Sequence, residues 1–220
     1  MAADPYTIIH ADDSLVVVAK APGVPSQRDA SGDLDLTMML KESLGKQPLV
    51  VHRIDRPASG LVVYARNTGA AAKLSALFRS GLVERRYWAI VGARPADESG
   101  TLQHRLVTVP ARNKTYVSDT RGKTSELRYR LAARSDRYWL LDVELQTGRH
   151  HQIRAQLAAI GCPIRGDVKY GAKRTLRGGG IGLHAYRLAF PHPVTSNPLS
   201  FFAPPPDDTL WVALSRDLLP

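Results

Sequence analysis

The sequence predicts an α+β fold, on the basis of three observations. Short β-rich runs occur near both ends of the chain and in its middle. Segments with apolar residues at helical spacing stand between them, but without the regular strand–helix alternation of a doubly wound sheet. The chain has 220 residues, of which 44% are hydrophobic, so it can bury a core of its own. We expect residues 1–220 to form a single domain.

In the first half of the chain, turn-forming residues separate short apolar runs. The pair Asp12–Asp13 lies between two β-rich runs, which indicates a hairpin. Gly45 and Gly81 are natural ends for two helices. These helices are expected to begin near Asp35 or Thr37 and near Asn67 or Thr68. Strands are expected over residues 6–10, 15–19, 48–51 and 61–65.

In the second half, residues 138–146 give the clearest signal. Apolar residues there alternate with Asp142, Glu144 and Gln146, which is the pattern of a half-buried strand. A helix is expected from about His150 to Ile160. Further strands are expected over residues 86–93, 183–190 and 199–202. The segments 105–123 and 169–177 hold many Lys and Arg residues with few acids, and we expect them to be loops.

The charge balance favours a polyanionic partner. Lys and Arg number 30 against 20 Asp and Glu, which gives a formal net charge of +10. Each phosphate that such a protein neutralises releases condensed counterions, and this release drives binding. A basic surface without a nucleic-acid partner is the alternative.

Cysteine content and hydropathy bear on the compartment. Cys162 is the one cysteine, which excludes an internal disulfide framework and suggests a reducing compartment. The chain shows neither a signal-peptide pattern nor an apolar run of membrane-spanning length. We therefore expect a soluble, cytoplasmic protein with no membrane partner, and a monomer by default.

Asp55 stands out as a candidate catalytic residue. It lies in a polar segment between two expected strands, flanked by Arg53 and Arg56 and followed by Pro57 and Gly60. A rigid loop at strand ends can present one carboxylate to a cleft. Local composition alone favours a different interpretation, in which Asp55 is a turn residue paired with its neighbouring arginines.

Four segments resemble one family. Residues 52–61 read HRIDRPASGL and closely resemble the H-R-[LI]-D-x-x-[TA]-S-G-L signature of the RluA-type pseudouridine synthases. Residues 85–91 are similar to that family's basic-x-Tyr-x-Ala-x-Val strand. Residues 147–154 are similar to its T-G-R-x-H-Q-I-R segment, and residues 183–193 to its L-H-A…F-x-H-P ending. The resemblance covers nearly the whole chain.

The resemblance implies an enzyme that isomerises uridine in ribosomal or transfer RNA to pseudouridine, with no DNA partner. It implies one catalytic domain, with a mixed, mainly antiparallel sheet flanked by helices and loops around a central cleft. The first expected strand begins almost at Met1, so we expect no N-terminal S4-type RNA-binding domain. The reaction is a redox-neutral isomerisation, and we expect no cofactor.

The resemblance also implies roles for three catalytic residues. Asp55 is the nucleophile, and it acts on a uridine flipped out of the RNA stack. It either attacks the sugar or prompts loss of a sugar proton. Arg154 neutralises that carboxylate in a desolvated pocket, and Tyr87 stacks on the uracil. The alternatives are a solvated helix residue for Arg154 and a core strand residue for Tyr87.

Further residues are expected to contact substrate. Leu183 packs against the base as a wall of the pocket, although it could equally be ordinary core. Arg53 and Arg149 are expected to contact the RNA. The phosphate contacts expected from the two basic segments are Arg112, Lys114, Lys123 and Lys173. A solvated charged face is the alternative for these four.

Some residues depart from the family's pattern. Residues 20–25 read KAPGVP and only approximate the family's K-P-x-G motif, while Gln27 and Gln156 stand where histidine is common. No metal site is expected, because no His, Cys or carboxylate set has zinc-like spacing. On a helix, the side chains of His150 and His151 would diverge by about 100°.

Two other functions compete with the enzyme. The first is a non-catalytic basic RNA-binding or ribosome-assembly module on the same fold. Intact Asp55, Tyr87 and Arg154 argue against it, since a pure binder needs none of them. The second is a carboxylate-based glycosidase, which lacks a second acid in any recognisable motif.

Overall fold

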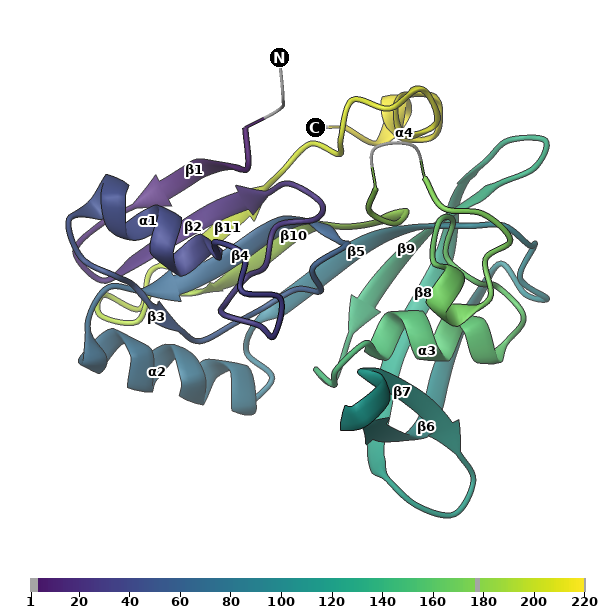
Figure 1. The fold of residues 1–220 in the computed structure, drawn as a ribbon, viewed down its shortest axis with the longest axis horizontal. Helices are drawn as coiled ribbons and strands as arrows, with labels where there is room; N and C mark the ends of the chain where they lie inside the picture. The colour runs from purple at the N-terminus through teal and green to yellow at the C-terminus, as the bar shows by residue number, and fades with distance from the viewer. Residues whose placement is uncertain (1–3, 177–178, 220) are drawn as a thin grey trace. The chain divides into compact units, whose positions relative to one another are not determined.

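The computed structural model describes residues 4–176 and 179–219, and the chain divides into two compact units (Figure 1). Unit 1 runs to Arg85 and resumes over Ala185–Pro206. Unit 2 covers Arg86–His184 and the chain from Asp207 onward. Unit 1 is therefore built from two stretches of chain, with most of unit 2 between them in sequence.

Unit 1 contains the strands β1 (Tyr6–Ala11), β2 (Leu15–Lys20), β4 (Ser59–Ala65) and β10 (Leu183–Pro191, from Ala185 onward), which are neighbours in that order. Two short strands extend it: β3 (Leu49–Val50) pairs with β4, and β11 (Pro198–Phe202) pairs with β10. The pairs β1–β2, β2–β4, β3–β4 and β10–β11 are antiparallel.

Two helices belong to unit 1, α1 (Leu36–Leu44) and α2 (Thr68–Arg79). Both begin where the sequence predicts, because the side chains of Asp35 and Asn67 accept hydrogen bonds from backbone N–H groups of the first turn. The core lies between α2 and the sheet, where Leu74 packs with Leu61 and Val63. All seven residues of β4 are buried, so this strand is central to the unit.

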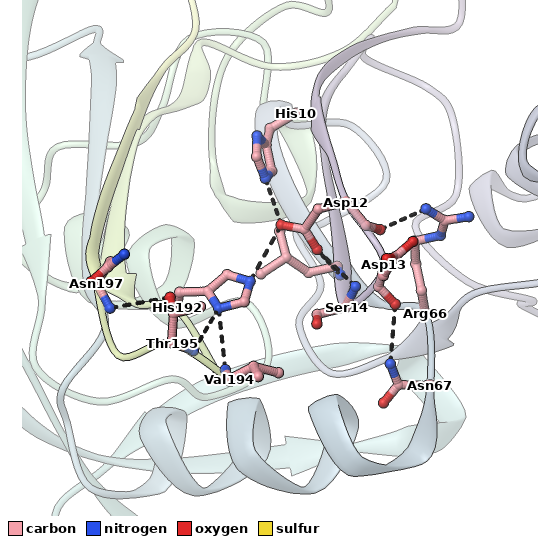
Figure 2. Close-up of polar contacts among 11 residues, drawn as sticks. His10, Asp12, Asp13, Ser14, Arg66, Asn67, His192, Val194, Thr195 and Asn197 are labelled. Carbon is pink, nitrogen blue, oxygen red and sulfur yellow. Dashed lines mark hydrogen bonds and ion pairs between the residues drawn. The ribbon is translucent and has the colours of Figure 1, made fainter.

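The hairpin turn between β1 and β2 is held to the chain beyond β10 by one carboxylate (Figure 2). Oδ2 of Asp12 lies 2.8 Å from Nε2 of His10 and 3.3 Å from Nε2 of His192. Oδ1 of Asp12 accepts from the backbone N–H groups of Ser14 and Leu15 at 2.7 and 3.0 Å. Asp12 thus joins two turns that are 180 residues apart in sequence.

Unit 2 contains five strands, which are neighbours in the order β5, β9, β8, β6, β7 and are all antiparallel. Their bounds are β5 (Glu84–Val91, from Arg86 onward), β6 (Ser99–Val109), β7 (Lys114–Ser118), β8 (Lys123–Arg134) and β9 (Trp139–Leu145). Helix α3 (Gln152–Ala159) packs on β6 and β7. The C-terminal helix α4 (Thr209–Ser215) packs on β8. Over the described residues, three single-turn 3-10 helices complete the elements: η1 (Pro110–Arg112), η2 (Val168–Tyr170) and η3 (Arg216–Leu218).

The predicted α+β class and the mainly antiparallel strand pairing are confirmed. The loop predicted over residues 105–123 is wrong, since this segment forms the last five residues of β6, then η1, β7 and the first residue of β8. Of the eleven residues of β6, one is buried, Leu106, so the strand carries no apolar alternation that sequence could reveal. Its backbone hydrogen bonds to β7 and β8 hold it in place.

The predicted start of the helix at His150 is also wrong, because α3 begins at Gln152. His151 has a left-handed backbone conformation, with φ of 52°, and so cannot continue a helix.

At Gly60, the backbone of β4 packs closely against the backbone of β10, and a substitution there tests this packing. Its φ is +108°, and a Cβ added there would lie 2.3 Å from the backbone oxygen of Ala185. We expect Gly60→Ala to lower the free energy of unfolding by at least about 2 kcal/mol more than Gly81→Ala. Gly81 is the control, since its φ is also positive (+74°) but a Cβ there meets nothing within 4 Å. Equal losses in urea unfolding would contradict this packing.

Candidate active site

The Asp55 loop of unit 1, residues 52–58, is fixed by backbone hydrogen bonds before it enters β4. The N–H of Ala58 donates to the carbonyl of Asp55 at 3.0 Å, which closes a turn around the carboxylate. The N–H of Gly23 donates to the carbonyl of Arg56 at 2.8 Å, and Oγ of Ser26 donates to the carbonyl of Ile54 at 2.9 Å. The half-buried Asp55 therefore stands on a loop with little freedom.

Lys20, at the end of β2, lies under this loop. Its Nζ donates to the carbonyl oxygens of Ala21, Arg56 and Ala58 at 2.8, 3.0 and 2.6 Å. Three carbonyls match the three N–H groups of an ammonium. Burial lowers the pKa of Lys20 to about 7, while the charge of Asp55 acts to raise it. Lys20 was not predicted as a site residue. In the sequence, its one signal is its place in the approximate K-P-x-G motif over residues 20–25.

The two arginines that flank Asp55 behave differently. Arg56 donates through Nε to the carbonyl of Gly23 at 2.9 Å and forms ion pairs with Asp29 and Asp33. These contacts fasten the Asp55 loop to residues 23–33. Arg53 is exposed, as a residue that contacts RNA phosphates would be.

His52 precedes these residues and is buried. Its ring stacks on Phe78 of α2, with 5.0 Å between centroids and 14° between planes. Within the described part of the chain, its Nδ1 has no hydrogen-bond partner. Burial, with a further contribution from the charge of Arg85, lowers the pKa of His52 to about 3. The imidazole is therefore neutral at physiological pH, and it packs as an aromatic ring.

In unit 2, strand β5 carries Tyr87. Its side chain is buried and lies opposite Val143 of β9 in the strand register. Strand alternation places Arg86 and Trp88 on the other face of β5. Leu183, at the start of β10, is also buried. Burial of Tyr87 and Leu183 is what the core interpretation predicts as well, so the catalytic role of Tyr87 and the substrate contact of Leu183 stay predictions.

Arg154 of unit 2 is not a solvated helix residue. It lies on α3 with 4% of its surface exposed. Its Nε lies 2.7 Å from Oδ2 of Asp167, and its Nη2 lies 2.9 Å from Oδ1 of the same carboxylate. Arg149, in contrast, is exposed in the turn before α3.

The two adjacent histidines lie together, contrary to the predicted divergence. The rings of His150 and His151 stack with centroids 3.7 Å apart, because both residues precede α3 and His151 has a positive φ. Nδ1 of His151 lies 2.9 Å from the hydroxyl of Tyr170, and Nδ1 of His150 lies 3.2 Å from Oγ1 of Thr115. These contacts connect the start of α3 to β7 and η2.

Comparison with known proteins decides the family. Residues 14–159 match the RNA pseudouridylate synthase family, and this range includes Asp55, Tyr87 and Arg154. The chain belongs to the RNA pseudouridylate synthase family. The resemblance seen in the sequence is thus confirmed, and so is the enzyme class: an RNA pseudouridine synthase, which isomerises uridine in RNA.

Curated relatives and solved structures agree with this family. The chain is 33% identical to ribosomal large subunit pseudouridine synthase D of Zymomonas mobilis, over 93% of this chain and 70% of that protein. It is 34% identical to the protein of the same name in Xylella fastidiosa, over 97% of this chain and 70% of that protein. The fold resembles human RNA pseudouridylate synthase domain containing 4, with a TM-score of 0.76, 24% identity, and coverage of 96% of this chain and 92% of that one.

The positive charge of this synthase is concentrated in unit 2. That unit holds nineteen Lys and Arg residues against eleven Asp and Glu, whereas unit 1 holds eleven against nine. Of the predicted phosphate contacts, Arg112, Lys123 and Lys173 are exposed. Lys114 is half-buried, with Nζ 5.2 and 5.0 Å from the ring centroids of Tyr116 and Tyr170. Arg177, in the second basic segment, lies outside the described residues.

Neither a metal-binding cluster nor a membrane-spanning helix occurs in the described part of the chain. No group of three or more His, Cys, Asp or Glu side chains is placed to hold a metal ion within residues 4–176 and 179–219. Over the same residues, no helix is both long and apolar enough to cross a membrane.

The neutral, buried His52 predicts how stability depends on pH. Its pKa is lower in the folded chain than in the unfolded chain, so the unfolded chain binds more protons between pH 6.5 and about 3. Stability should therefore fall as the pH drops through this window, by up to about 1.4 kcal/mol per pH unit from this group. We expect His52→Phe to remove that part of the dependence. Urea unfolding of both proteins at pH 7, 5.5 and 4 measures it, and parallel stability curves would contradict it.

Proposed function

We propose that this synthase isomerises specific uridines of ribosomal or transfer RNA with Asp55 as the nucleophile. The observation that carries the assignment is the ten-residue match over residues 52–61, whose aspartate stands on a loop anchored by Lys20. The large-subunit names of two relatives favour ribosomal RNA as the substrate. The two units work as one catalytic domain in this proposal.

The chemistry explains why one ionised carboxylate is needed. The C1′–N1 bond of uridine breaks, a C1′–C5 bond forms after the uracil turns over, the proton on C5 leaves, and N1 gains a proton. A carboxylate divides this into easier steps, whether it attacks C1′ or prompts loss of a sugar proton. The uridine has to leave the RNA stack to reach it. Both routes leave atoms and electrons balanced without an oxidant or reductant.

The other site residues have supporting roles in this proposal. Arg154 neutralises the Asp55 carboxylate during the reaction, and its burial supports a role other than that of a solvated helix residue. Tyr87 stacks on the flipped uracil and assists loss of the C5 proton. Leu183 forms a wall against the base. Arg53 and Arg149 are both exposed, as direct contacts to RNA require.

The protein's setting completes the proposal. It works as a cytoplasmic monomer that binds RNA through its basic second unit, with no DNA or membrane partner. The single cysteine and the charge distribution between the units support this assignment.

Asp55→Asn tests the nucleophile. The amide is nearly isosteric but a poor nucleophile, so we expect RNA binding to persist while pseudouridine formation falls at least 1,000-fold, roughly 4 kcal/mol of barrier. Tritium release from 5-³H-uridine RNA measures the rate. Asp13→Asn, in an exposed turn of the same unit, is the control and should keep full activity. Turnover by Asp55→Asn within tenfold of wild type would refute the nucleophile assignment.

The dependence of RNA affinity on salt tests the phosphate contacts. We expect the Arg112→Ala, Lys123→Ala, Lys173→Ala triple variant to bind more weakly, with a log–log salt slope flatter by up to about one unit per lost contact. The single-turnover rate at saturating RNA should stay near wild type, because these residues only position the substrate. The control replaces three exposed lysines of unit 1, namely Lys41, Lys46 and Lys73. If both triple variants shift the slope equally, the unit 2 cations form only a solvated face.

A further inference from the structure

The carboxylate of Asp167 holds the guanidinium of Arg154 in place. Asp167 is 2% exposed, and its two oxygens bind Nε and Nη2 of Arg154 at 2.7 and 2.9 Å. A bidentate pair of this kind fixes the plane of the guanidinium as well as its distance. It also makes burial of the positive charge tolerable, since the pair as a whole carries no net charge.

The backbone around Asp167 is itself rigid. The N–H of Asp167 donates to the carbonyl of Ile164 at 3.0 Å. Its own carbonyl accepts from the N–H groups of Tyr170 and Ala172, both at 3.0 Å. The backbone that carries this carboxylate is therefore held in a closed turn that leads into η2.

Tyr170, three residues further on, fixes one face of the guanidinium. Its ring centroid lies 4.9 Å from Cζ of Arg154, within the range of a cation–π contact. The ring is held through its hydroxyl, which accepts from the N–H of Thr115 at 2.8 Å and lies 2.9 Å from Nδ1 of His151. The turn over residues 167–170 therefore contacts the guanidinium of Arg154 twice: Asp167 binds its Nε and Nη2, and the ring of Tyr170 lies over its face.

We propose that Asp167 is a positioning residue for pseudouridine formation, acting through Arg154 with Tyr170 as its support. Asp167 engages two of the five N–H donors of the guanidinium, so the direction of the other three follows from this cradle. The inference rests on the proposed function of Arg154 as the group that neutralises the nucleophile. A group that stabilises charge must be held in place before the charge develops, because reorientation during the reaction costs rate.

A double-mutant cycle tests the proposal. We expect Asp167→Asn to lower the single-turnover rate at saturating RNA at least tenfold, while the RNA concentration for half-saturation changes less than threefold. In an Arg154→Lys background, the same substitution should lower the rate less than threefold, because the group it positions is already gone. Asp167→Glu keeps the charge but displaces it by one methylene, and should be at least threefold slower than wild type.

The control is a second Arg–Asp pair of unit 2, at the start of α4. Oδ1 of Asp208 lies 3.1 Å from Nη1 of Arg165. Asp208→Asn removes the negative charge of the carboxylate but keeps an oxygen that can cap α4. Its rate should stay within twofold of wild type. Thermal melting gives the folded fraction of each variant, and each rate is divided by that fraction. If Asp167→Asn does not fold, the rate of Asp167→Glu decides the test.

The outcomes separate this inference from the proposed function. Equal rate losses from Asp167→Asn in both backgrounds, or a fully active Asp167→Glu, would overturn the positioning role. A wild-type rate for Arg154→Met, which removes the positive charge, would instead refute the function proposed for Arg154. Asp55→Asn reports on the nucleophile independently of either result.

Discussion

A lysine ammonium that leaves water has to find an acceptor for each of its N–H groups, and in this protein that requirement shapes the Asp55 loop. Lys20 satisfies it with three backbone carbonyls, two of which belong to the residues directly after Asp55. The carbonyls have to point inward to reach Nζ, and the loop conformation follows. Because β4 begins within the next few residues and is buried throughout, the loop is fixed at both ends.

Unit 2 also buries a cationic side chain, that of Arg154. Arg154 is as deeply buried as Lys20, but a side-chain carboxylate balances its charge, whereas backbone dipoles surround the lysine. The distinction matters chemically. Because carbonyls carry no net charge, the charge of Lys20 stays available to act on Asp55. The charge of Asp55 in turn acts to raise the pKa of Lys20. Asp167 neutralises Arg154 but determines where its N–H groups point.

Much of the fold and the family was predictable from sequence, because the informative signals were local. Asp35 and Asn67 cap the helices they were expected to cap, and the residue pattern over 52–61 identified the family. Strand β6 escaped prediction because one of its eleven residues is buried and its position depends on backbone pairing with β7 and β8. Strand β8, in contrast, buries the alternate residues Ser125, Leu127 and Tyr129, so a strand signal was present in the sequence there.

The partners of the site residues escaped for a related reason. Asp167 is 13 residues from Arg154, and Lys20 is 35 residues from Asp55, so no spacing rule joins either pair. His151 illustrates the limit at short range. Its left-handed conformation breaks the helix one residue before Gln152 and turns its ring onto that of His150, although nothing in its residue type announces this.

The split of unit 1 between two stretches of chain has a consequence for how the protein is made. A ribosome delivers β1, β2, β4 and the Asp55 loop early, yet β10 and β11 emerge only after residues 86–184 have been synthesised. Until then, Gly60 lacks the backbone it packs against, and Asp12 lacks His192. Contacts of such long sequence separation form slowly. Strand β4, which follows the Asp55 loop, is therefore translated early but gains its neighbour β10 only near the end of synthesis.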